Sequence, residues 1–135
     1  MRILGIDPGE RRVGLAVSDE LGITAQGLDT FDKQGGIDLV PYIRELVDSF
    51  DIEKIVVGYP IGLSGQLGTS AEGAKQLAHV LQEQIGLEVT LWDERFSSEE
   101  ARRVLKGQRA NKSDVDKLAA VIILQSYLDF SRRSG

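Results

Sequence analysis

Short apolar runs at the start of the chain predict a pair of buried strands. Ile3–Asp7 and Val13–Ser18 carry apolar residues on both pleat faces, as expected of strands that are covered on two sides. A Pro-Gly pair stands between them, which indicates a tight turn and antiparallel neighbours. A weaker pattern predicts a third strand near Ile23–Phe31.

Helical stripes then alternate with short strands. Apolar residues between Ile37 and Phe50 repeat with a helical period, and Pro41 fits only in the first turn of that helix. The rest of the chain predicts strands at Lys54–Gly58 and Val89–Trp92 and helices at Ala71–Ile85, about Ser98–Lys106 and Asp114–Phe130. This order predicts an α/β fold with one five-stranded mixed sheet flanked by helices. We find no repeat or linker, so residues 1–135 are expected to form one domain.

Composition narrows the class of protein. The 135 residues are 41% hydrophobic and 27% charged, which is typical of a globular domain. The chain has no cysteine, which excludes a disulfide framework, a thiolate nucleophile and a cysteine-zinc site. Its longest apolar stretch, Leu118–Leu124, is too short to span a membrane, and the first residues do not resemble a signal peptide. We expect a cytoplasmic protein with no membrane partner.

The charge is unevenly distributed. A net charge of −5 argues mildly against a nucleic-acid partner, but the stretch from Ala101 to Ser113 is basic and contains no acid. Its basic residues are Arg102, Arg103, Lys106, Arg109 and Lys112. Two interpretations are open: a solvated helix face with a polar loop, or a rim that docks phosphates. The second gains weight because Glu94 and Asp116 flank the run.

Two carboxylates stand at the ends of predicted strands. Asp7 ends the first strand and Glu94 follows the fifth, and the carboxyl ends of strands are where ligands bind in open α/β sheets. Asp116 opens the last helix, where it has a structural alternative as the partner of Ser113 in a capping box. That helix is apolar on nearly every face, so we expect it to press on the sheet and to bring Asp116 beside the strand ends.

Three converging carboxylates would need a cation between them. They would otherwise repel one another and resist ionisation. Two divalent ions would balance three carboxylates and one phosphodiester, as in two-metal phosphodiester cleavage. A site of oxygen ligands alone suits Mg²⁺ or Mn²⁺. The pattern therefore predicts a metal-dependent endonuclease.

Four stretches of the chain resemble one family. GIDPGERRVGLAVSD, VVGYPIGLSG, WDERFSS and KSDVDKLAAVIILQSYL together resemble the YqgF family of pre-16S ribosomal RNA nucleases, which are similar to Holliday-junction resolvases. The resemblance implies a ribonuclease-H-like fold, a divalent metal, and a role in maturing the 5′ end of pre-16S rRNA. Carried onto this sequence, it places the catalytic and metal-binding acids at Asp7, Glu94 and Asp116.

Residues near these acids have weaker claims. Arg11, Arg12 and Arg95 stand beside the predicted acids and could contact substrate phosphates. Trp92 is expected in the core. His79 is expected at the surface.

The sequence also allows two other functions. The chain could resolve Holliday junctions in branched DNA, or it could be a non-catalytic nucleic-acid-binding module. Clustered acids favour an enzyme, because a pure binding surface has no use for negative charge that faces phosphates. We expect a precursor rRNA or branched DNA as partner, and a monomer or weak homodimer.

Overall fold

The computed structural model describes residues 1–9, 11–36, 38–59, 69–93 and 112–134. Its centre is a mixed sheet with the strand order β3-β2-β1-β5-β6, and the short β4 also pairs with β2. The strands are β1 (Arg2–Asp7), β2 (Arg12–Ser18), β3 (Ala25–Gly27), β4 (Phe31–Asp32), β5 (Ile52–Tyr59) and β6 (Glu88–Asp93). β1 runs antiparallel to β2 and parallel to β5, which in turn is parallel to β6.

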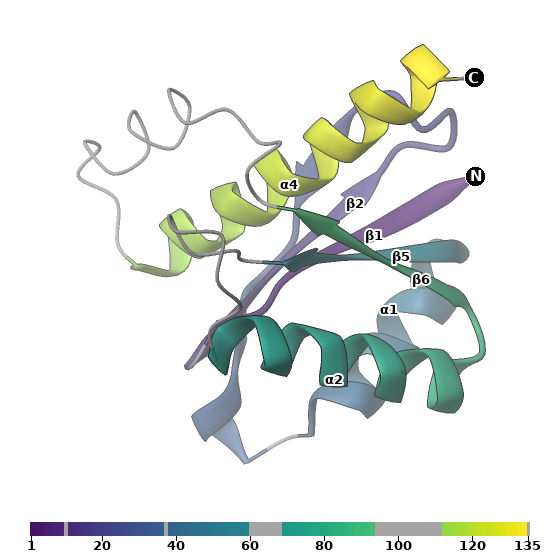
Figure 1. The fold of residues 1–135 in the computed structure, drawn as a ribbon. Helices are drawn as coiled ribbons and strands as arrows, with labels where there is room; N and C mark the ends of the chain where they lie inside the picture. The colour runs from purple at the N-terminus through teal and green to yellow at the C-terminus, as the bar shows by residue number, and fades with distance from the viewer. Residues whose placement is uncertain (10, 37, 60–68, 94–111, 135) are drawn as a thin grey trace.

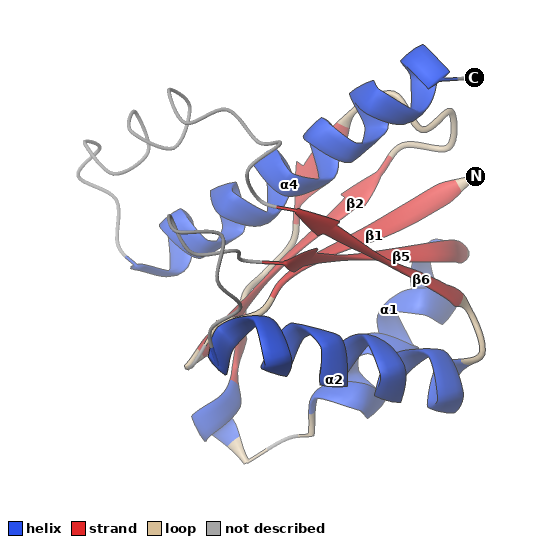
Figure 2. Ribbon diagram, viewed as in Figure 1, coloured by secondary structure: helices blue, strands red, loops and turns tan. Residues whose placement is uncertain are grey.

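Helices cover both faces of the sheet (Figures 1 and 2). The helices are α1 (Leu39–Phe50), α2 (Thr69–Ile85) and α4 (Lys112–Ser134), with a 3-10 turn η1 at Lys33–Gly35. Among the described helices, α1 and α2 pack on one face of the sheet and α4 packs on the other. The α/β architecture predicted from the order of apolar runs is confirmed.

The core is divided between these two faces. One cluster joins β-strand residues such as Leu4 and Ile6 to α1 and α2. The other joins Ile3 and Trp92 to buried residues of α4. Adjacent residues of β1 therefore belong to opposite clusters, as the alternation of side chains along a strand requires. The expected core position of Trp92 is confirmed, since it is 8% exposed.

The predicted third strand is present as two short strands. Ala16 of β2 pairs with Gly27, whereas Val13 pairs with Phe31, so the partner segment uses one residue more than β2 over this span. An extra residue of this kind is a bulge, and it divides β3 from β4. The other predicted strands, and the helices at 37–50, 71–85 and 114–130, are found with bounds shifted by a few residues. The helix predicted at about 98–106 lies outside the described residues.

Pro41 occupies the place that the sequence predicts. It is the third residue of α1, where a backbone N–H has no partner within the helix. The missing N–H of proline costs no hydrogen bond there.

Polar side chains of α4 secure the edge strand β3. The Gln125 side chain accepts a hydrogen bond from the Ala25 backbone N–H (3.0 Å) and donates one to the Ile23 carbonyl oxygen (2.8 Å). Nearer its start, α4 sends the Lys117 ammonium to within 3.8 Å of an Asp29 carboxylate oxygen. α4 is thereby tied to the segment on both sides of β3. In the part of the chain that the structure describes, no helix is long and apolar enough to cross a membrane.

Candidate active site at the carboxyl edge of the sheet

Three parallel strands end at one edge of the sheet. The register places Ile6 of β1 beside Val57 of β5, and Tyr59 of β5 beside Asp93 of β6. α4 begins at this same edge and runs toward the opposite one (Figure 1). The carboxyl edge is therefore where β1, β5 and β6 end and where α4 begins.

Asp7 ends β1 on the face that α4 covers. Ile3 packs in the α4 cluster and Leu4 and Ile6 pack in the opposite one, so alternation along the strand gives Asp7 to the α4 face. Asp7 is half-buried and pairs with Gly14 of β2. The structure thus places a carboxylate at the carboxyl edge, beneath the helix that carries Asp116.

The turn after Asp7 depends on a glycine. A Cβ atom added at Gly9 would lie 2.3 Å from the backbone oxygen of Arg12. A backbone oxygen cannot move aside as a side chain can, so no larger residue fits this turn. Gly9 therefore fixes how the chain passes from Asp7 into β2.

Close contacts seat α4 on the sheet. A Cβ atom at Gly5 would lie 2.8 Å from Cβ of Leu124, and one at Gly27 would lie 2.5 Å from Cγ of Lys117. Ala120 is fully buried in the same interface. Small residues on both elements let the helix backbone come close to the strands, and the helix presses on the sheet as its apolar faces predict.

The predicted acids differ in what the structure describes of them. Asp7 lies as described above. Glu94 directly follows the last residue of β6 and lies outside the described residues. Asp116 is the fifth residue of α4, and its side chain also lies outside the described part. Within the described side chains there is no group of three His, Cys, Asp or Glu that could hold a metal ion.

The predicted phosphate-binding residues fall largely outside the described part. These are Arg95, Arg102, Arg103, Lys106 and Arg109, together with the side chain of Lys112. Arg11 is exposed and its carbonyl oxygen accepts a hydrogen bond from the Lys33 backbone N–H (2.9 Å). Arg12 is half-buried at the start of β2 and pairs with Asp32 of β4. Both arginines therefore follow the Gly9 turn that leads away from Asp7.

Trp92 and His79 lie where the sequence predicts them. Trp92 faces α4, where its indole N–H donates to the Ser126 hydroxyl (3.0 Å), and this gives Asp93 to the opposite face. His79 is exposed on α2 beside Glu83, at 3.2 Å. Sequence reasoning missed the positioning roles of Gly9, Gly27 and Gln125. The one available signal was the polar Gln125 after a continuous apolar run.

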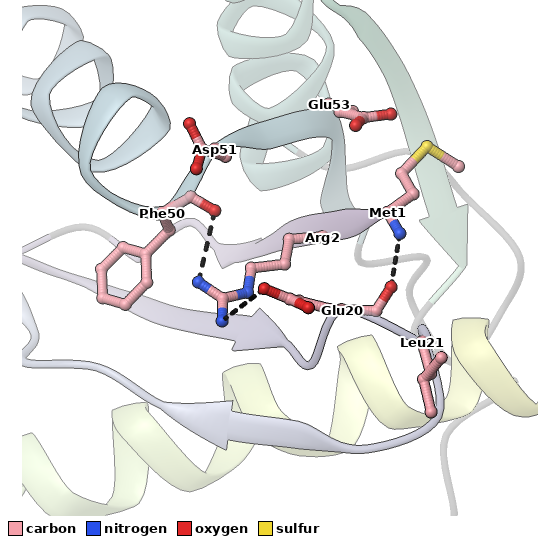
Figure 3. Close-up of a pocket in the computed structure, with 7 residues that line it drawn as sticks. All are labelled: Met1, Arg2, Glu20, Leu21, Phe50, Asp51 and Glu53. Atoms are coloured by element: carbon pink, nitrogen blue, oxygen red, sulfur yellow. Dashed lines mark hydrogen bonds and ion pairs between the residues drawn. The ribbon is translucent and has the colours of Figure 1, made fainter.

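A hollow on the opposite edge does not belong to this site. It has a volume of about 350 Å³ and is lined by Met1, Arg2, Glu20, Leu21, Phe50, Asp51 and Glu53 (Figure 3). The Arg2 guanidinium there donates to the Phe50 carbonyl oxygen (3.5 Å) and pairs with the Glu20 carboxylate (3.7 Å). Three acids line this hollow beside one arginine, and Glu20 already pairs with that arginine, so the hollow does not favour a phosphate.

Comparison with known proteins identifies close relatives. The model of the RuvX family, described as a Holliday junction resolvase, matches residues 1–130. A protein of Geobacillus sp. (strain WCH70) named "Putative pre-16S rRNA nuclease" is 44% identical over 135 residues, covering 96% of this chain and 98% of its own. A protein of the same name from Listeria monocytogenes serotype 4b (strain CLIP80459) is 47% identical over 138 residues, with the same coverage.

Solved structures share the fold at much lower identity. Thermus thermophilus RuvC in complex with a Holliday junction substrate has a TM-score of 0.66 at 18% identity, covering 98% of this chain and 96% of that chain. The yeast mitochondrial Holliday junction resolvase Ydc2 has a TM-score of 0.56 at 13% identity, covering 97% and 79%. Together these structures confirm the predicted ribonuclease-H-like fold.

Proposed function

The chain belongs to the RuvX family of Holliday junction resolvases, and from that premise we propose that it is a metal-dependent endonuclease of structured nucleic acid. Its substrate is the precursor of 16S rRNA, which it cuts in maturing the 5′ end. Relatives at 44% and 47% identity carry a pre-16S rRNA nuclease name, which supports this choice. The enzyme works in the cytoplasm, as one domain of residues 1–135, and as a monomer or weak homodimer.

The position of Asp7 carries the proposal. It is a half-buried carboxylate at the end of a central strand, on the face where α4 begins. Asp116 precedes the buried Ala120 by four residues and Tyr127 by eleven, a spacing that repeats along one face of a helix. Glu94 directly follows β6 and is two residues after Trp92, which faces α4. Side chains two residues apart along a strand share a face, so we expect Glu94 on the α4 side. All three acids are therefore expected on one side of the carboxyl edge.

This donor set fits a hard divalent cation. Asp7, Glu94 and Asp116 would hold Mg²⁺ or Mn²⁺, because carboxylate oxygens are the ligands that these ions prefer. When bound, the ions activate a water and stabilise the leaving oxygen of the phosphodiester. The half-burial of Asp7 under α4 supports this, since a partly dehydrated carboxylate gains most from a nearby cation.

Basic residues of the chain would hold the substrate. Arg11 and Arg12 leave the Gly9 turn close in sequence to Asp7, and Arg95 follows Glu94 directly. The basic run follows β6 in the sequence and ends at the first residue of α4, so both of its ends connect to elements that meet the carboxyl edge. Its residues are Arg102, Arg103, Lys106, Arg109 and Lys112. Contacts of such side chains to phosphates position a nucleic acid without reading its sequence.

A cleavage assay tests the proposal. Precursor 16S rRNA fragments and four-way DNA junctions are incubated with the protein, with Mn²⁺ or with a chelator. We expect metal-dependent cleavage of the RNA, and its loss by orders of magnitude in Asp7→Asn. Asp93→Asn is the matched control, because Asp93 lies at a strand end on the opposite face and should not be needed.

The same assay separates the alternatives. Preferred cutting of the four-way junction would support a junction resolvase, which the description of the family model favours. Binding of either substrate without cleavage by the unaltered protein would identify a non-catalytic module. Cleavage retained in Asp7→Asn would refute the acidic site.

A further inference from the structure

A lysine of α2 lies over the last residue of β5. The Lys75 ammonium nitrogen is 5.7 Å from the centroid of the Tyr59 ring. Tyr59 is half-buried and stands beside Asp93 in the register of β5 and β6. Tyr59 is the last residue of β5, so Lys75 and Tyr59 lie at the carboxyl edge. β5 is the neighbour of β1, the strand that Asp7 ends. α2 also begins at this edge (Figure 1).

Unlike Lys54 and Lys117, Lys75 has no counter-ion among the described residues, a property that it shares with Lys33. Lys54 pairs with Glu88 and Lys117 pairs with Asp29, each at 3.8 Å. Among the described residues no carboxylate pairs with Lys75, which is exposed. An aromatic ring attracts an ammonium without neutralising it. Tyr59 therefore orients a cation whose full charge is available to an anion.

The geometry places this cation across the strand ends from the acids. Tyr59 packs against the cluster of α1 and α2, whereas Asp7 faces α4. Neighbouring strands are only about 4.8 Å apart, so a polyanion that passes over the carboxyl edge would meet both sides of it. The acids need a cation to accept a phosphate, and Lys75 needs none.

We propose that Lys75, oriented by Tyr59, binds a backbone phosphate of the substrate on the α2 side of the carboxyl edge. This inference rests on the proposed nuclease function and adds to it a contact outside the basic run. Lys75 is a binding residue, and Tyr59 is a positioning residue. The contact is sequence-independent, because a phosphate carries no base identity.

A binding titration in a salt series tests this. All variants are made in the Asp7→Asn protein, so that a labelled hairpin of precursor 16S rRNA is bound and not cut. Lys75→Ala should weaken binding and lower the slope of log K against log salt by about 0.7 to 0.9, the value for one phosphate contact. Tyr59→Phe should keep the parent slope, whereas Tyr59→Leu should lose part of it.

Lys54→Ala is the matched control. Lys54 also lies over a ring, at 5.1 Å from the Tyr127 centroid, but near the start of β5 and paired with Glu88. The slope of log K against log salt for Lys54→Ala should equal that of the Asp7→Asn parent. An unchanged slope in Lys75→Ala, or an equal loss in Lys54→Ala, would overturn the inference while the parent still binds RNA. If the Asp7→Asn parent does not bind the hairpin and the wild-type protein does not cleave it, the proposed function itself is overturned.

Discussion

At the carboxyl edge, Asp7 and Gly9 lie two residues apart and contribute in different ways. Asp7 supplies a charge that the site needs, and Gly9 supplies space, because any Cβ there would meet a backbone oxygen at 2.3 Å. A charge can be kept or removed without changing shape, whereas a clash with backbone forces the turn to move. The two residues must therefore be tested by different substitutions.

Asp116→Asn distinguishes catalysis from capping at one position. Asparagine keeps the shape and an oxygen that can cap, but removes the charge that a metal needs. As a metal ligand, Asp116 predicts a loss of cleavage by orders of magnitude with unchanged or higher stability, since repulsion from Asp7 and Glu94 is relieved. The measurements are the melting temperature and Mn²⁺-dependent cleavage of the variant.

α4 begins at Lys112, one residue before Ser113, so Ser113 lies inside the helix and is not the N-cap that the sequence predicts. Ser113→Ala is the control for a structural role at the start of this helix. If Asp116 only stabilises the start of α4, Asp116→Asn should lose at most about 1 kcal/mol of unfolding free energy and keep its activity. A variant that is active and less stable would thus contradict a three-carboxylate site.

Among the elements, α4 does most to shape the site. Within the described part of the chain it is the helix that covers one face of the sheet, and its first turns reach the edge where Asp7 lies. Gly27 leaves space for α4 on the sheet, as Gly9 leaves space for the turn after β1. Because this strand residue has no side chain, the Lys117 stem can lie on β3 and α4 can come down beside it.

Gly27→Ala should disturb the start of α4. The added Cβ would lie 2.5 Å from Cγ of Lys117, so the helix or its side chain must shift. We expect the Mn²⁺ concentration for half-maximal cleavage to rise by about tenfold, as for other residues that orient metal ligands. The double variant Gly27→Ala/Lys117→Ala should restore it, because the clashing stem is gone.

Gly35→Ala is the matched control for this test. A Cβ atom there meets nothing within 4 Å, so metal dependence should not change. A Gly27→Ala protein with wild-type metal dependence would show that this contact does not position α4.

Periodicity predicted the strands and helices because each element follows one local pattern of apolar and polar residues. Buried strands such as β1 are apolar on both faces, and α1 shows its stripe together with a proline that only a first turn accepts. The bulge between β3 and β4 escaped prediction, because it depends on which residue of β2 each partner meets. The contacts of Gly27 and Gln125 escaped for the same reason: they join segments about a hundred residues apart, and no local pattern encodes them.

For the whole molecule, the sheet links two core layers that lie on opposite faces. Adjacent residues of the same strand, such as Ile3 and Leu4, belong to different layers. Loss of one layer would expose the sheet that the other layer needs. The two layers are therefore expected to unfold together.

The single tryptophan of the chain provides the test. Trp92 is buried against α4, with its ring centroid 5.3 Å from that of Tyr127, so its fluorescence reports the docking of this helix. Far-UV circular dichroism reports all helices. In a urea titration the two signals should give coincident transitions. A fluorescence midpoint at lower urea would show that α4 leaves the sheet first.

The amide of Gln125 also bears on how this protein behaves among its own copies. Its oxygen accepts from Ala25 N–H and its nitrogen donates to the Ile23 carbonyl oxygen, the same pair of bonds that a neighbouring strand would make. A side chain thus takes the place of a peptide group at the β3 margin of the sheet. Open margins of this kind recruit other chains and lead to aggregation. By occupying those two groups, Gln125 withdraws two pairing sites of this margin from a second molecule, which favours a protein that stays dispersed at high concentration.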